Sequence, residues 1–244
     1  MPFTLSHSAA VLPFLRSKHL SATGLIIGSM APDFEYFFRM DVKGIYGHTV
    51  LGVFYFDLPV ATLLAIIFHM VVKKNLIDNL PVFLQARFQE IRNSEFVTYL
   101  NEHKLDFAIS VIIGTATHII WDGFTHKRQF FVEALPSIYE GRTINLLGIH
   151  YPLWYGLQLL STIVGGVILT IYILAMKPAA GNFNKPGILY WLILAAIIAI
   201  TVAIRMQFSV ANEKYVVIVI TIVSAFCIGI TILGMIPFFR RKEN

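Results

Sequence analysis

The sequence predicts an all-α fold, a polytopic transmembrane helical bundle. The first indication is composition: 57% of the 244 residues are hydrophobic and 14% are charged, with a mean hydropathy of +0.71. Soluble domains are about 45–50% apolar and about 25% charged. The second indication is a series of apolar runs, each near the roughly 20 residues that a helix needs to cross a bilayer. Together they indicate an integral membrane protein.

We expect about five spans, at residues 51–72, 105–125, 152–176, 187–206 and 215–238. The last two spans carry almost no functional side chains except Arg205. We therefore predict two halves. Residues 1–151 form a metal-site half with two spans, and residues 152–244 form a three-span membrane anchor.

The N-terminal region is apolar but interrupted. Residues 1–20 have the pattern of a short amphipathic segment, and the apolar stretch 21–38 contains Pro32 and two acidic residues near its end. A stretch of that length with a helix breaker is a poor spanning helix. We expect it to be half-inserted, with Gly24 and Gly28 allowing close helix packing.

Residues 73–104 are the most polar part of the chain. Within them the apolar residues from Leu80 to Ile91 recur at helical spacing and predict an amphipathic interfacial helix that lies on the membrane or packs on the bundle. We expect its basic side chains to form a solvated face; these are Lys73, Lys74, Arg87, Arg92 and Lys104. His69, just before this region, is expected at the interface without a chemical role.

Residues 127–151 are expected to form a loop. Arg128 or Arg142 could hold an anionic substrate there, although a salt-bridged surface loop accounts for them as well.

The charge pattern bears on partners and orientation. The formal net charge is +5, but the basic residues are spread along the chain, so we expect membrane lipid and no nucleic acid as partner. The clusters Lys73-Lys74 and Arg240-Arg241-Lys242 fall on one side of a five-span arrangement and predict that this side is cytoplasmic. The single cysteine, Cys227, excludes an intramolecular disulfide. Nothing in the sequence defines the oligomeric state.

The stretch TATHIIWDGFTH carries the strongest functional signal. His118, Asp122 and His126 are spaced by four residues, so they share one face of a helix. Burying a carboxylate and two imidazoles in an apolar helix is unfavourable unless they are paired or bind a cation. The stripe therefore indicates either a metal site or a hydrogen-bonded polar cluster without metal.

Other polar residues are expected on the same side of the membrane, near helix ends. The candidate metal ligands are His7, Asp33, His48, His118, Asp122 and His126. Imidazole and carboxylate without thiolate suit zinc, manganese or iron. They allow one closed site or two metals that share a carboxylate, and Asp122 is placed to bridge. A metal would lower the pKa of a bound water toward neutral, which is the chemistry of phosphoester hydrolysis. Asp33 or Glu35 could act as general base.

The motifs MPFTLSH, IGSMAPDFEYF, GHTVLGVFYFDLP and GTATHIIWDGFTH resemble the membrane family called domain of unknown function 4184, over nearly the whole chain. More distantly, the pattern is similar to inner-membrane metal-dependent hydrolases. More distantly still, it is similar to the zinc-dependent phospholipase C and P1 nuclease group of helical phosphoesterases.

These distant resemblances imply a ligand set. Asp33, His48, His118 and Asp122 would surround one metal, and His7 would help to bind another that shares Asp122. The second helical His-xxx-Glu pair of that group is missing, which limits the expectation to one or two metals. They also imply a bacterial inner-membrane location, and the charge pattern places the site on the non-cytoplasmic side.

Two functions remain open at this point. One is a membrane-embedded metal-dependent hydrolase with Asp33 and Asp122 as catalytic residues, zinc as the first candidate metal, and a phosphoester or lipid-linked substrate. The other is a non-enzymatic membrane protein, a structural or assembly factor or a carrier, whose polar residues serve packing. The last three spans carry almost no polar functional side chains, which disfavours a carrier, since transporters place polar residues in several spans near mid-membrane.

Overall fold

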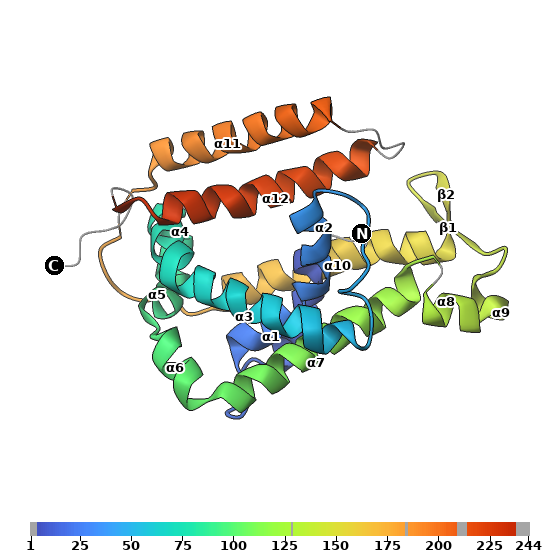
Figure 1. Cartoon of the computed structure of the whole chain (residues 1–244), viewed down its shortest axis with the longest axis horizontal. Coiled ribbons are helices and arrows are strands. Elements are labelled where there is room, and N and C mark those ends of the chain that lie inside the picture. The colour runs from blue at the N-terminus through green and yellow to red at the C-terminus, as the bar shows by residue number, and fades with distance from the viewer. Residues whose placement is uncertain (1–3, 128, 184, 209–213, 238–244) are drawn as a thin grey trace. The chain divides into compact units, whose positions relative to one another are not determined.

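The structure is a computed structural model, and it describes residues 4–127, 129–183, 185–208 and 214–237. Within these residues the chain is mainly helical, with one two-stranded hairpin (Figure 1). Five helical segments are long and apolar enough to cross a membrane: Val53–Asn79, Lys104–Thr125, Leu153–Ala175, Ile188–Gln207 and Tyr215–Gly234. The predicted all-α class and the five spans are confirmed, and the protein is an integral membrane protein.

The chain forms two compact units, and each is built from separate segments. The first contains residues 1–33, 46–61 and 104–175, and the second contains residues 34–45, 62–103 and 176–244. The predicted halves, residues 1–151 with the metal site and residues 152–244 as the membrane anchor, are defined by the positions of the candidate ligands. This division stays a prediction.

The first unit contains two of the long helices. Its elements are the 3-10 helix η1 (Thr4–Phe14), α1 (Ala22–Gly28), the 3-10 turn η2 (Ala31–Asp33), the π-helical turn η3 (Val53–Asp57), the start of α3 (Leu58–Ile67), α7 (Lys104–Thr125), α8 (Phe130–Ala134), α9 (Pro136–Tyr139), β1 (Thr143–Leu146), β2 (Ile149–Pro152) and α10 (Leu153–Ala175). Helix α7 packs against α1, α10 and η1. It is therefore the element around which this unit is organised.

Three glycines bring α1 and α7 into backbone contact. A Cβ atom on Gly28 would lie 2.4 Å from the Val111 carbonyl oxygen, and one on Gly114 would lie 2.4 Å from the Leu25 carbonyl oxygen. A Cβ on Gly24 would lie 2.9 Å from the Phe107 carbonyl oxygen. The close packing expected at Gly24 and Gly28 is confirmed. It places the turn that follows α1 directly against the middle of α7.

Residues 21–38 do not form a spanning helix. Helix α1 has seven residues, about 10 Å of length. Its N-cap is Ser21, whose hydroxyl accepts a hydrogen bond from the Gly24 amide. The turn η2 follows, and then α2 (Phe34–Arg39) begins the second unit. The interruption predicted at Pro32 is thus confirmed, and the half-inserted placement stays a prediction.

The second unit continues with η4 (Phe68–Val72), α4 (Lys73–Asn79), α5 (Val82–Asn93), α6 (Phe96–Glu102), α11 (Ile188–Gln207) and α12 (Lys214–Gly234). Helices α11 and α12 pack together, with Tyr190, Leu194 and Leu233 at the centre of their apolar contact. The Asn75 side-chain amide of α4 donates to the carbonyl oxygens of Leu233, Gly234 and Ile236. The first two are the last residues of α12, and Ile236 follows that helix. This contact satisfies backbone acceptors that a helix end leaves free.

Residues 73–104 correct part of the sequence prediction. They form α4, which continues the first span, then α5, which covers the predicted amphipathic pattern, and then the short helix α6. Lys73 and Arg92 are buried, not solvated. The Arg92 guanidinium donates to both carboxylate oxygens of Asp78, at 2.6 and 3.1 Å, and the Lys73 ammonium donates to Ser94. The amphipathic pattern could not reveal the burial of Arg92, because its partner comes from another helix.

The predicted loop 127–151 has structure of its own. It contains α8, α9 and the antiparallel hairpin β1–β2, in which Asn145 pairs with His150. Gly148, with φ +83°, supplies the left-handed conformation that a tight hairpin turn needs. Arg128 and Arg240-Arg241-Lys242 lie outside the described residues, so the substrate role of Arg128 and the charge argument for sidedness stay predictions.

Candidate metal centre

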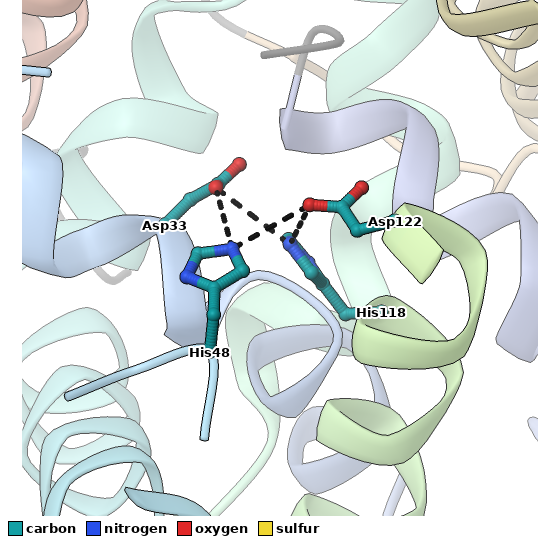
Figure 2. A group of neighbouring side chains, drawn as sticks. All are labelled: Asp33, His48, His118 and Asp122. Carbon is teal, nitrogen blue, oxygen red and sulfur yellow. Dashed lines mark ion pairs between the residues drawn. The ribbon is translucent and has the colours of Figure 1, made fainter. Parts of the chain in front are cut away.

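Four side chains from three segments of the first unit meet in one place (Figure 2). His118 and Asp122 lie one turn apart on α7, Asp33 ends η2, and His48 stands in the loop between α2 and η3. One ligand atom from each of the four lies within 4.8 Å of all the others. The structure therefore brings together four of the six predicted ligands around one point.

The distances within this cluster are regular. His118 Nε2 lies 3.6 Å from Asp33 Oδ1 and 3.4 Å from Asp122 Oδ2. His48 Nε2 lies 3.6 Å from the same Asp33 oxygen and 3.5 Å from the same Asp122 oxygen. These separations exceed the roughly 2.7–3.2 Å of ordinary N–H···O hydrogen bonds. Ligands about 2.0–2.2 Å from a tetrahedral zinc lie about 3.3–3.6 Å apart. The spacing therefore fits a shared cation better than direct hydrogen bonds.

His118 is held in the orientation that a metal ligand needs. Its Nδ1 lies 2.7 Å from the Ser29 carbonyl oxygen, which can only accept, so Nδ1 carries the proton and Nε2 presents its lone pair. His118 is fully buried, and among the described residues its Nε2 has no hydrogen-bond partner. Metal-binding histidines usually donate their other ring N–H to a carbonyl or carboxylate. A lone pair directed at two carboxylate oxygens needs a cation or a proton between them.

Asp33 is oriented by a residue near the N-terminus. The Thr4 hydroxyl donates to Asp33 Oδ2 at 2.6 Å, while Oδ1 faces the two histidines. On a 3-10 helix, residues three apart lie on the same side, so η1 directs Thr4 and His7 to the cluster together. Such outer hydrogen bonds fix the carboxylates that bind metals.

The loop that carries His48 is pressed against the turn that carries Asp33. A Cβ atom on Gly47 would lie 2.6 Å from the Pro32 carbonyl oxygen, so only glycine fits at this position without a shift. The backbone of the loop and that of the turn are therefore in close contact at Gly47. The His48 side chain is 15% exposed, compared with 6% or less for the other three. The cluster is therefore most accessible on the His48 side.

The second oxygen of Asp122 faces two more predicted ligands. His7 Nε2 lies 3.5 Å and His126 Nδ1 lies 3.3 Å from Asp122 Oδ1. The His7 ring also stacks on His118, with centroids 3.8 Å apart. Burial, together with the nearby His118, lowers the pKa of His7 to about 3 despite the opposing charge of Asp122. His7 is accordingly a neutral imidazole at neutral pH.

His126 is positioned by α10. The Gln158 side-chain amide donates to His126 Nε2 at 3.1 Å, so the ring proton lies on Nδ1, next to Asp122 Oδ1 and the Thr125 hydroxyl. Burial lowers the pKa of His126, against the effect of Asp122. In this arrangement the Nδ1–H of His126 faces Asp122 Oδ1 and can orient that carboxylate. The predicted roles of His7 and His126 as metal ligands, and of Asp33 and Asp122 as catalytic residues, stay predictions.

Glu35, the other candidate general base, is already engaged. Its Oε1 accepts from the Arg39 guanidinium at 3.0 and 3.1 Å and from the Ile45 amide at 2.8 Å. It belongs to the second unit. These partners favour a structural role for this carboxylate.

Sequence reasoning missed three groups that support the cluster: the Thr4 hydroxyl, the Ser29 carbonyl and the Gln158 amide. Thr4 had the pattern of a helix cap, and a backbone carbonyl leaves no sequence signal. Gln158 could have been noticed as an amide inside an apolar span, since such a side chain needs a partner.

Fold and site together define an integral membrane protein of helices with a buried Asp/His cluster that could hold a metal ion. The particular family follows from comparison: the model of the family described as Domain of unknown function (DUF4184) matches residues 1–235. The chain belongs to this family, as its motifs predicted. No curated protein and no solved structure matches the chain. The distant similarity to hydrolases is not shown by these comparisons and stays a prediction from the motifs.

Proposed function

We propose that this protein is a membrane-embedded metal-dependent hydrolase that acts on a phosphoester or lipid-linked substrate. The observation that carries the proposal is the four-residue cluster, in which two imidazole nitrogens and two carboxylate oxygens face one another at 3.4–3.6 Å. We take zinc as the first candidate, with manganese and iron as alternatives.

The residues of the site would have two kinds of role, holding the cation and orienting the side chains that hold it. The four residues of the cluster would hold the cation, while Thr4 orients Asp33, the Ser29 carbonyl orients His118, and Gln158 acts on Asp122 through His126. A divalent cation supplies a Lewis acid and a water of lowered pKa at neutral pH. A tetrahedral zinc with four protein ligands is closed and usually structural, so catalysis here would need a fifth coordination position. The partly exposed His48 side is where such a position would face the substrate.

The site's position supports a substrate at the membrane boundary. Asp122 lies in the last turn of the span Lys104–Thr125, so a reacting bond there would be near the headgroup level of a lipid. We further propose the bacterial inner membrane as location, with the site on the non-cytoplasmic side. The location rests on the resemblance, and the sidedness rests on the charge pattern.

The alternative, a structural polar cluster without enzymatic role, is separated from the hydrolase by the substitution Asp122→Asn. The full chain, purified in detergent, is assayed with added zinc for hydrolysis of bis(p-nitrophenyl) phosphate and of phospholipid, and its melting temperature is measured without metal. A hydrolase loses turnover and keeps its metal-free melting temperature, whereas a structural cluster loses stability. The matched control is Asp106→Asn, at the other end of α7. Wild-type protein that is purified without metal and binds none of zinc, manganese or iron when they are added would reject the proposal.

A further inference from the structure

A cavity lies beside the cluster, within the first unit. Its volume is about 530 Å³, and its walls come from η1, α7 and α10, with Tyr139 of α9 at one edge. That volume falls in the range of about 300–1,000 Å³ that is typical of small-molecule sites. The walls are mostly hydrocarbon, contributed by side chains such as Trp121, Phe124, Leu157, Leu160, Val164 and Ile168.

The few polar side chains around the cavity are engaged with the backbone. The hydroxyl of Ser6 donates to the Thr162 carbonyl, that of Tyr139 to Phe124, that of Thr125 to Trp121 and that of Ser161 to Gln158. His7 is different: its Nε2 has no hydrogen-bond partner among the described residues. The cavity therefore offers apolar surface along its length, and His7 is the lining residue with an unsatisfied polar atom, which faces Asp122 Oδ1.

That polar atom marks the end of the cavity that adjoins the cluster. His7 lines the cavity, and its Nε2 lies 3.5 Å from Asp122 Oδ1. The hydrogen bond between Gln158 and His126 shows that the cluster lies beside the Gln158 position of α10. From there the lining continues along α10 as far as Ile168.

The length and the direction of the cavity match one leaflet of a bilayer. From Leu157 to Ile168 the helix rises roughly 16 Å, about half of the roughly 30 Å hydrocarbon core. Helix α10 is long and apolar enough to cross a membrane, and its lining residues run from Leu157 near its start to Ile168. The Ile168 end of the cavity therefore lies deeper in this span than Gln158, which contacts the cluster through His126.

We infer that this cavity binds one acyl chain of a membrane lipid, with the lipid headgroup at the Asp/His cluster. The headgroup part rests on the proposed function, and the acyl-chain part stands on the cavity alone. The hydrocarbon of an acyl chain has no polar group along its length, which suits the apolar lining of the cavity. The ester end of the acyl chain, which joins it to the headgroup, would lie beside His7.

The test is photolabelling of the full chain in nanodiscs with a phosphatidylglycerol that carries a diazirine at the end of one acyl chain. Adducts are mapped by tandem mass spectrometry. We expect them to concentrate on Leu160, Val164 and Ile168. Val164→Trp fills the cavity and should lower this labelling about tenfold. The matched control, Ile163→Trp, changes a neighbouring exposed residue outside the lining and should leave it unchanged.

The outcomes separate the two proposals. Adducts spread evenly over exposed positions such as Ile163 and Ile171, or equal effects of the two tryptophan variants, would overturn the inference. Labelling of the cavity in a chain that hydrolyses neither substrate supports the inference and rejects the hydrolase. Should Val164→Trp fail to fold, judged by circular dichroism and melting temperature, Leu160→Phe takes its place with the same control.

Discussion

The ring of His118 donates from Nδ1 to the carbonyl oxygen of Ser29 at 2.7 Å, across 89 positions of the chain. This one hydrogen bond connects the packing of two helices to the chemistry of the cluster. It exists because glycines let α1 approach α7 closely, and it leaves His118 Nε2 directed at Asp33 and Asp122.

We expect the wild-type chain to bind a divalent cation and to lose it when His118 is changed. Purified protein should contain about one zinc, manganese or iron per chain by elemental analysis, and His118→Ala should abolish it. Because ligands must be deprotonated to bind, uptake should weaken as the pH falls below neutral. His150→Ala, at an exposed position of β2, is the control and should bind as wild type does. Equal metal content in both variants would contradict a role for His118.

The Thr4 hydroxyl should matter for metal affinity although it would touch no metal. Thr4→Val removes the hydrogen bond to Asp33 Oδ2 and leaves the side-chain shape nearly unchanged. Loss of such outer partners typically lowers metal affinity about 10–100-fold. The dissociation constant for zinc, measured by competition with a chelating dye, should rise by that factor. Thr170→Val, on the exposed face of α10, should leave it unchanged; a shift as large as that of Thr4→Val would point to a general effect of the substitution.

The glycine packing between α1 and α7 should be sensitive to one methyl group. In Gly28→Ala the new Cβ would lie 2.4 Å from the Val111 carbonyl oxygen, and overpacking of this kind costs about 1–3 kcal/mol. The displaced α1 would also move Ser29, so both the melting temperature and the zinc affinity should fall. Gly166→Ala is the matched control on α10, since a Cβ there meets nothing within 4 Å and alanine gains up to about 1 kcal/mol of helix propensity. A Gly28→Ala protein as stable as wild type would show that the helices can separate at little cost.

Much of this structure could be predicted from the sequence, for identifiable reasons. Spans are visible because a run of about 20 apolar residues is rare outside membrane helices. The pairing of His118 with Asp122 is visible because helical spacing alone places them on one face. The five-span arrangement could place Asp33 and His48 on the same side of the membrane as this pair. Which residues surround one metal is implied only by resemblance, since no local rule connects a turn, a loop and a helix. The Ser29 carbonyl and the tautomer of His126 depend on tertiary contacts and leave no trace in residue identity.

The buried pair of Arg92 and Asp78 could not be predicted from the sequence either, because the two residues lie on different helices of the second unit. Arg92→Leu would leave the Asp78 carboxylate buried without its guanidinium, which typically costs about 3–5 kcal/mol. The double variant with Asp78→Leu removes both charges and should recover most of that loss. Thermal unfolding of the full chain in detergent measures both effects. Arg87→Leu is the control on the same helix: the Arg87 guanidinium donates to the Phe83 carbonyl one turn away, and its loss should change stability by less than about 1 kcal/mol. If Arg92→Leu behaved like Arg87→Leu, Arg92 would belong to the solvated face that the sequence predicted, and its burial against Asp78 would not contribute to the fold.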